Sequence, residues 1–302
     1  SIQLSVPILT GDPQKTKIFS TKSGAKRIFQ QADVPVPMGA HDIYSEKDFY
    51  EQLTKLIANQ LYINTWIFKI DDEFGGRGHA SLQVDGIKTV MELRKRKVTM
   101  TEAIVKKLEE VMIKIVPKKA KIAMPSLYQS WDEYMRRFCK VGGVIEATPM
   151  CPAAQLSMPS VSFFIEPDGE TRLIGSFDRI EATQYVNGGC FFPQTSLPSV
   201  NLVQLAKSIT AVLYDKGMIG HVTVDLVSFP NPTDPAAHPL FWAVDISAHL
   251  SDYASICFFF DILMEGELDA ETGDYEIESL EEGQAELTGT QKKEVMGDMG
   301  QD

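Results

Sequence analysis

The chain has 302 residues, of which 44% are hydrophobic, enough to bury the core of one large domain or of two to three lobes. No run approaches the roughly 20 uncharged apolar residues of a membrane helix, and the N-terminus lacks a signal-peptide pattern. The four cysteines lie far apart without a Cys-x-x-Cys pair, which favours free thiols in a reducing, cytoplasmic compartment. Because the chain begins at Ser1 rather than at a methionine, we expect a segment of a longer protein.

The net charge of −12 is unevenly distributed. Residues 265–302 hold thirteen acidic residues against two lysines and few apolar side chains, which predicts a flexible acidic tail, or alternatively a strap that docks on a basic partner. Residues 88–121 carry eleven Lys and Arg against four Glu. These bases form either the solvated face of a helix or a patch for an acidic surface, including the chain's own tail. Aromatic residues are not interleaved with them, which argues against nucleic acid as a partner.

The first half of the chain predicts helices and a strand pair. A helix over 23–33 is followed by the extended segment VPVP, because a residue before proline avoids helical geometry. An amphipathic helix is predicted over 46–61, with Phe49, Leu53, Leu56, Ile57 and Leu61 on its apolar face. Two strands, 64–70 and 78–84, are joined by a glycine-rich loop. A lysine-rich helix over 99–116 places Ile104, Leu108, Val111, Met112 and Ile115 on one face.

Residues 130–266 add further helices and strands, and the order along the whole chain is mixed α+β, with antiparallel strand pairs and interleaved helices. The most secure element is a hairpin over 160–182, whose two strands flank a Pro-Asp-Gly turn. The other predicted elements are a helix over 130–141, a strand over 142–150, a helix over 199–217, strands over 220–229 and 240–250, and a final buried helix over 252–266.

The order of these elements resembles the ATP-grasp fold. Lys69 stands on a strand before the glycine-rich loop, and two later strands each carry an acid, Asp225 and Asp245. The resemblance implies two α+β lobes with antiparallel sheets that clamp ATP and Mg²⁺ between them. It divides the chain into 1–40, the end of a preceding region with a first helix; 41–145, a lobe with the glycine-rich flap and the basic helical segment; 146–264, a lobe with the metal-site strands; and 265–302, the acidic tail.

More narrowly, STKSGAKRIF, FKIDDEFGG, GGVIEA and VDLVSF resemble the ATP-grasp-like region of the IQ-motif-containing protein H family. That family is associated with motile cilia and sperm flagella, so the resemblance implies axonemal or cytoskeletal partners and a place in the axoneme. The family name also implies a calmodulin-binding IQ motif. The Ile2-Gln3 pair lacks the basic residues that should follow it, so calmodulin binding is not expected of this segment.

The resemblance assigns a nucleotide site to specific residues. Lysines on ordered elements suit the phosphates, glycines let backbone N–H groups approach phosphate oxygens, and arginine adds a fork of donors. A hinge carboxylate suits the ribose hydroxyls. The expected nucleotide-binding residues are Lys22, Lys69, Gly75, Gly76, Arg77, Gly78 and Glu146. The acidic run Asp71-Asp72-Glu73 beside this site disfavours ATP unless its side chains point outward or recruit a metal.

The predicted magnesium ligands are Asp225, Asp245 and Ser247, since Mg²⁺ needs hard oxygen donors. ATP-grasp ligases usually end in a Glu-x-Asn-x-Arg-like segment, but here the run is Asp-Ile-Ser-Ala-His over 245–249. Ser247 is a poorer neutral ligand than asparagine, and Thr223 stands where an arginine is often found. These departures make stabilisation of an acyl-phosphate transition state harder.

Three functions follow from the resemblance. The first is a degenerate ATP-grasp module that acts as a structural or interaction component of a motile cilium. The second is an active ATP-dependent carboxylate–amine or carboxylate–thiol ligase working through an acyl phosphate with Mg²⁺. The third is a switch in which ATP closes the two lobes without ligation. A fold alone does not choose among them, and the sequence identifies no confident catalytic residue.

Overall fold

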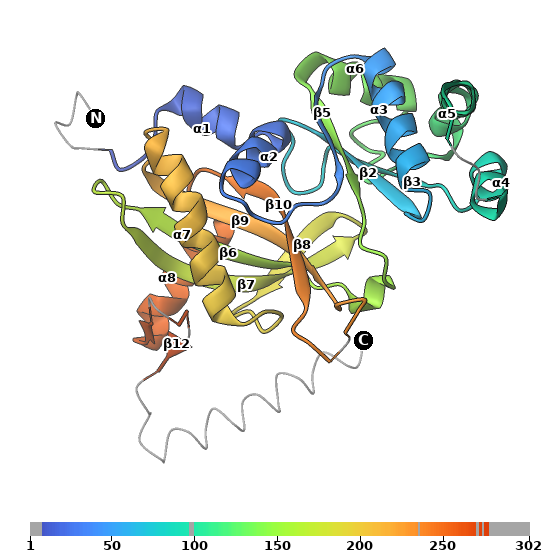
Figure 1. The fold of residues 1–302 in the computed structure, drawn as a ribbon. Helices are drawn as coiled ribbons and strands as arrows, with labels where there is room; N and C mark the ends of the chain where they lie inside the picture. The colour runs from blue at the N-terminus through green and yellow to red at the C-terminus, as the bar shows by residue number, and fades with distance from the viewer. Residues whose placement is uncertain (1–7, 97–99, 235, 270–271, 274, 278–302) are drawn as a thin grey trace, which may run out of the picture.

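The computed structural model describes residues 8–96, 100–234, 236–269, 272–273 and 275–277. Figure 1 shows two lobes, each built around a sheet with helices packed on it. In these residues both main sheets have five strands, and every strand pairing in them is antiparallel. The α+β class with two antiparallel sheets is therefore confirmed.

The first sheet has the strand order β1-β5-β2-β3-β4. Its strands are β1 (Gly39–Ile43), β2 (Thr65–Ile70), β3 (His79–Gln83), β4 (Lys121–Ile122) and β5 (Gly143–Ala147). The predicted pair around the glycine-rich loop is confirmed, because β2 and β3 form a hairpin in which Lys69 stands opposite His79. Strand β5 spans the boundary expected at 145/146 and belongs to this first sheet, opposite β2.

Four helices cover the first sheet: α3 (Glu46–Asn59), α4 (Lys88–Arg96), α5 (Glu102–Lys119) and α6 (Trp131–Val141). On α3 the predicted apolar face is buried at Phe49, Leu53 and Ile57, and the ring of Phe49 meets Phe68 of β2 edge to face at 4.9 Å. On α5 the fully buried residues are Leu108, Met112 and Val116, while the lysines lie exposed on its outer side.

The second sheet has the order β10-β9-β6-β7-β8. Its strands are β6 (Pro159–Ile165), β7 (Thr171–Thr183), β8 (Val186–Phe191), β9 (Gly220–Phe229) and β10 (Leu240–Ser247), preceded by the short helix η1 (Ala153–Gln155). The predicted Pro-Asp-Gly hairpin is confirmed as β6 and β7. Its turn needs Gly169, whose φ of +92° is readily adopted only by glycine.

Helix α2 (Lys22–Gln31) connects the two lobes, between α1 (Pro13–Phe19) and the first sheet (Figure 1). Its apolar face, Ala25, Ile28 and Phe29, is buried in the core of the second lobe with residues of α7 (Ser199–Asp215). Its first turn reaches the first lobe, because the backbone N–H of Lys22 donates to the carbonyl of Asp71. The helix therefore presents the side chains of its first turns to the space between the two sheets.

Helix α8 (Asp252–Met264) forms where a final helix was predicted, but the prediction that it is buried is wrong. Only Ala254 and Cys257 are buried, because the helix packs against β7 on one side alone. The acidic tail is also not uniformly irregular. Strands β11 (Glu267–Leu268) and β12 (Tyr275–Glu276) pair, anchored by the Tyr275 ring against Phe192 and Phe260. The remainder of the predicted tail, 278–302, lies outside the described residues.

All four cysteines carry free thiols, as predicted. Among the described residues, no helix combines the length and apolarity needed to cross a bilayer.

Candidate functional site

Five buried charged side chains meet between the two lobes. Lys69 Nζ lies 3.0 Å from Glu146 Oε2 and 3.4 Å from Asp245 Oδ2. Lys22 Nζ lies 3.2 Å from Asp245 Oδ1, and Lys26 Nζ lies 2.6 Å from Glu146 Oε1. Three lysines thus share two carboxylates in one network, and all five residues are less than 9% exposed.

The local structure explains why these side chains converge. Lys22 and Lys26 are four residues apart on α2, so they project from the same helix face. Thr21 and Asp71 fix the start of that helix by accepting from the N–H groups of Gly24 and Ser23. Glu146 on β5 is the register partner of Ile67 on β2. Its side chain therefore shares a sheet face with Lys69, because strand residues two apart lie on one face.

The charge state of the network follows from burial and pairing. Burial alone would raise the pKa values of Glu146 and Asp245, but the neighbouring lysines hold both pKa values below their usual range. For Lys69, burial lowers the pKa, while Asp245 and Glu146 raise it to a value above normal. For Lys26 burial dominates over Glu146, so its pKa is lowered. Both carboxylates are consequently ionised at neutral pH.

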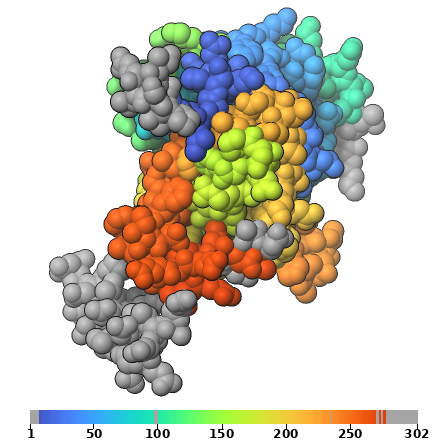
Figure 2. Space-filling model, turned by 90° about the vertical axis from the view of Figure 1, so that its left-hand side faces the viewer, coloured from blue at the N-terminus to red at the C-terminus, as the bar shows by residue number. Residues whose placement is uncertain are grey.

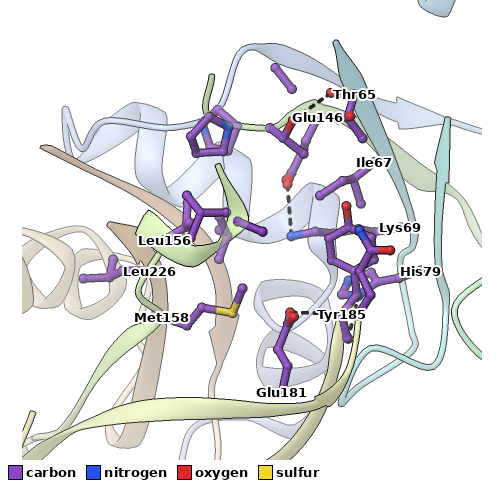
Figure 3. Close-up of a pocket in the computed structure, with 18 of the residues that line it drawn as sticks. Thr65, Ile67, Lys69, His79, Glu146, Leu156, Met158, Glu181, Tyr185 and Leu226 are labelled. Atoms are coloured by element: carbon purple, nitrogen blue, oxygen red, sulfur yellow. Dashed lines mark hydrogen bonds and ion pairs between the residues drawn. The ribbon is translucent and has the colours of Figure 1, made fainter. Parts of the chain in front are cut away.

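A cavity of about 420 Å³ opens beside this network. Figure 3 shows the Lys69 ammonium pointing to Glu146, with apolar side chains from both lobes facing the same space. The apolar wall includes Ile67, Ala147, Leu156, Met158 and Leu226. Lys69, His79, Glu146 and Asp245 lie at one polar end, and Arg179 and Glu181 are further charged lining residues. A cavity of this kind fits a flat apolar ring system joined to a polar or anionic group.

His79 is held neutral at the edge of the cavity. Burial lowers its pKa to about 3, assisted by the positive charge of Lys69. Its Nδ1 lies 3.3 Å from the Tyr185 carbonyl, and because a carbonyl only accepts, Nδ1 carries the proton. Nε2 then presents a buried lone pair for which no protein donor lies within hydrogen-bonding distance in the described structure.

The glycine-rich loop 74–78 closes onto the second lobe. Gly75 and Gly76 have φ of +62° and +83°, and a Cβ on Gly76 would lie 1.7 Å from the Tyr185 carbonyl oxygen. The Phe74 ring packs edge to face on His249 at 5.9 Å, and Lys22 Nζ lies 5.6 Å from its centroid. Arg77 is exposed. The loop has the backbone freedom expected of a phosphate flap, but Gly75, Gly76, Arg77 and Gly78 do not line the cavity.

The acidic run before the loop points away from the cavity. Asp71 accepts from the N–H and hydroxyl of Ser23 at 2.8 and 2.9 Å. Asp72 pairs with Arg137 at 2.6 Å, and Glu73 accepts from the Tyr128 hydroxyl at 2.7 Å. Each of the three acids thus has its own structural partner. None of the three acids is among the residues that line the cavity beside Lys69 and Glu146.

Two of the predicted magnesium ligands lie on neighbouring strands, but their carboxylates contact different residues. Asp225 and Asp245 are register partners on β9 and β10. Asp225 accepts from Ser160 Oγ at 2.8 Å and lies 3.5 Å from Arg179 Nη1, whereas Asp245 faces Lys22 and Lys69. Ser247 stands opposite Thr223. The described residues contain no group of three or more His, Cys, Asp or Glu arranged to hold a metal.

Residues 13–271 match the sequence profile of the family described as IQCH-like, ATP-grasp. The chain belongs to the IQCH-like ATP-grasp family. It is 31% identical over 287 residues to IQ motif-containing protein H of Danio rerio, covering 91% of this chain and 27% of that relative. The chain therefore spans about a quarter of the length of the curated relative it matches.

Solved structures show the same fold at low sequence identity. Biotin carboxylase of Campylobacter jejuni, described as a β,γ-ATP complex, has a TM-score of 0.54 at 13% identity over 91% of this chain and 52% of its own. The biotin carboxylase domain of Hydrogenobacter thermophilus 2-oxoglutarate carboxylase, described with MgADP, ADP and bicarbonate, has a TM-score of 0.57 at 9% identity over 90% and 48%. These likenesses confirm the ATP-grasp fold.

The ATP-grasp fold implies two bound groups, ATP and Mg²⁺, and the residues of this chain suit only the first. ATP fits, because the apolar wall of the cavity ends at the ammonium group of Lys69 and at Nε2 of His79, which can accept a hydrogen bond. Magnesium does not fit, because one candidate carboxylate is shared by two lysines and the other faces an arginine. A divalent cation at either carboxylate would compete with positive charge already in place.

Several contributors were missed from the sequence. Lys26 lies four residues after Lys22, and this spacing was a readable signal that both point the same way. Arg179 on β7 supplies the cation for Asp225. Tyr185, in the turn between β7 and β8, supplies the carbonyl that holds His79. For Arg179 and Tyr185 no local pattern existed, because their partners are brought to them only by tertiary packing.

Proposed function

We propose that the chain is an ATP-binding module of the ATP-grasp type that has lost its metal centre and no longer performs ligation. The observation that carries this proposal is the distribution of charge at the predicted metal site. Asp245 is bound by Lys22 and Lys69 at 3.2 and 3.4 Å, and Asp225 by Arg179 at 3.5 Å. A Mg²⁺ ion of the kind an ATP-grasp ligase uses would need these carboxylate oxygens as ligands, and here both already face positive charge.

Support for nucleotide binding comes from the cavity itself. Its wall draws apolar side chains from both lobes, namely Ile67 from β2 and Leu226 from β9, as expected for a ring held between two sheets. When bound, ATP would supply a polyphosphate that the protein must neutralise. Lys69 is the lysine at the cavity's polar end, and Lys22 lies next to it through their shared partner Asp245.

We further propose that the module serves as a structural or interaction component of a motile cilium or flagellum, with axonemal or cytoskeletal partners. Membership of the IQCH-like family supports this placement. Expression of a tagged full-length protein in multiciliated cells tests it. Signal along the axoneme is expected, and signal confined to the cytosol or to another organelle would contradict the placement.

Calorimetric titration of the chain with ATP, in Mg²⁺ and separately in EDTA, tests the binding function. We expect saturable binding of similar strength in both buffers, and at 100 times the dissociation constant a stabilisation of about 2.7 kcal/mol. Lys69→Ala should abolish binding. Because Lys69 is buried, the volume-matched Lys69→Met and a circular dichroism spectrum establish that the loss is not unfolding. Lys118→Ala, on the exposed face of α5, is the matched control.

Absence of heat and of a melting shift at millimolar ATP would contradict nucleotide binding. Binding that vanishes in EDTA would contradict the loss of the metal site. In that case the ligase becomes the leading candidate. It is favoured by one observation, that Lys22, Lys69 and Asp245 already meet at one point. Steady release of ADP with a panel of carboxylates and amines or thiols is the readout that would establish it.

A further inference from the structure

Helix α8 carries an apolar stripe that no part of the described structure covers. Ile256, Phe259 and Leu263 are spaced three and four residues apart and are 50%, 63% and 64% exposed, and Ile262 beside them is 73% exposed. This spacing places them along one helix face. In Figure 2 the orange segment that includes α8 stands at the surface. Four large apolar side chains on one face mark an interaction site rather than scattered surface residues.

The surface around this stripe is strongly acidic. Residues 217–291 contain no lysine or arginine. Exposed acids lie on α8, at its C-cap and on the strands that follow it: Asp252, Asp261, Glu265, Glu267 and Glu276. Glu267 and Glu276 stand directly opposite each other in the β11–β12 pair. Like charges placed opposite each other destabilise a strand pair, so a cation from outside would relieve a repulsion built into this ribbon.

The basic residues of the neighbouring strand already have partners. Helix α8 packs against β7, whose Arg172 donates to Glu166 and stacks on Phe164. Arg179 of the same strand pairs with Asp225 and donates to the Leu226 carbonyl. Within the acidic group, the Asp261 carboxylate accepts from the neutral Tyr275 hydroxyl at 2.9 Å. The negative charge beside the stripe is therefore not balanced by these two arginines.

We propose that α8 is the docking site for a basic amphipathic helix of a partner protein. A helix packs along the exposed face of another when ridges of side chains three and four apart fit the partner's grooves, and α8, with 13 residues, offers a face about 20 Å long. The apolar stripe would bury the partner's apolar face, and the acids around it would select lysine or arginine at its margins.

A second copy of the chain is a poorer occupant. Its basic surface is the outer side of α5, where Lys106, Lys107, Lys114 and Lys118 are exposed. On that side Ile113, 46% exposed, is the large hydrophobic residue available. One apolar side chain cannot cover the four presented by α8. The charge of α5 matches the acidic surface, but its apolar content does not.

The test uses two fluorescein-labelled helical peptides of about 18 residues, or five turns, with the same leucine stripe. One has lysines at the stripe's margins and the other has glutamates. Anisotropy is measured against the complete 302-residue chain. We expect the lysine peptide to bind and the glutamate peptide not to bind. Affinity should fall in Glu267→Gln/Glu276→Gln and with added salt, because the margin contacts are exposed ion pairs.

The double variant Phe259→Ser/Ile262→Ser locates the site. It should weaken the lysine peptide at least about tenfold, or about 1.4 kcal/mol, while Ile113→Ser on α5 should leave binding unchanged. Both side chains are exposed, and circular dichroism confirms that the variant remains folded. Equal binding of the two peptides, equal binding by all variants, or no binding overturns the proposal. So does concentration-dependent self-association in sedimentation that Phe259→Ser/Ile262→Ser abolishes, because the occupant would then be a second copy.

Discussion

Asp225 and Asp245 stand opposite each other in the β9–β10 ladder, yet their carboxylates are bound by different cations from different elements. The register shifts between Ala243 and Asp245, and an irregularity of this kind re-aims the side chains next to it. Asp245 consequently meets the lysines of α2 and β2, while Asp225 meets Ser160 and Arg179. Although the two residues are neighbours in the sheet, their carboxylates do not form a common metal site.

Asp245→Asn distinguishes between two roles of this residue, a partner of the buried lysines and a magnesium ligand. Removing one carboxylate from a buried network leaves Lys22 short of a partner, so we expect a loss of about 3–5 kcal/mol in the free energy of unfolding. Under the proposed function, ATP affinity in EDTA should rise, because the freed ammonium groups attract phosphate. Denaturant unfolding and calorimetry measure both quantities. Asp72→Asn, whose carboxylate pairs with Arg137 outside the cavity, should leave ATP affinity in EDTA unchanged. A fall in ATP affinity in Asp245→Asn that is seen in Mg²⁺ but not in EDTA would instead indicate that Asp245 is a metal ligand.

Gly76→Ala tests the contact between the loop and the second lobe. A Cβ at this position would lie 1.7 Å from the Tyr185 carbonyl oxygen, so the loop must move away from the β7–β8 turn. We expect faster proteolysis of the loop and weaker ATP binding. Gly75→Ala is the control, because it shares a positive φ but has open space around it. It should show only the backbone cost of about 1–2 kcal/mol. Equal effects of both substitutions would indicate that backbone strain alone matters.

His79→Gln should change the pH dependence of stability. The pKa of His79 is lowered to about 3 in the folded chain, from an ordinary value of 6.5. Between these values the unfolded state binds a proton that the folded state does not. The free energy of unfolding therefore falls as pH drops below 6.5, by up to about 1.4 kcal/mol per pH unit. Urea unfolding from pH 7 to 5 should show a shallower fall in the free energy of unfolding for His79→Gln than for the wild type. Identical slopes for the two proteins would mean that the fold does not lower the pKa of His79.

Glu146→Gln should change how the free energy of unfolding depends on pH in the acidic range. The pKa of Glu146 is held below its ordinary 4.5 by Lys26 and Lys69 against the opposing effect of burial. A lowered pKa gives stability that is complete well above 4.5 and is lost as pH falls through the folded-state value. Glu146→Gln should be less stable than wild type at pH 7, with the difference shrinking toward pH 3. Glu51→Gln, an exposed partner of Lys55, is the control and should follow the wild-type curve.

The sequence by itself determined the elements and the fold class. Local signals were sufficient where a periodic apolar face or a turn dictates the backbone, as on α3 and at the Pro-Asp-Gly turn before β7. The strand-borne Lys69 and its glycine loop were readable because the hairpin around them is local. Apolar content without periodicity misled, because the run of 252–266 predicts a buried helix, whereas the observed helix α8 is covered on one side only.

The tertiary structure alone decided what the charged residues do. Lys22 and Asp245 are more than two hundred positions apart in sequence, and only the placement of α2 between the lobes brings their side chains to 3.2 Å. Whether a buried carboxylate binds a metal, a lysine or an arginine depends on which charges the fold places within a few ångströms, because Coulomb energies fall with distance and rise where water is excluded. No local pattern carries that information.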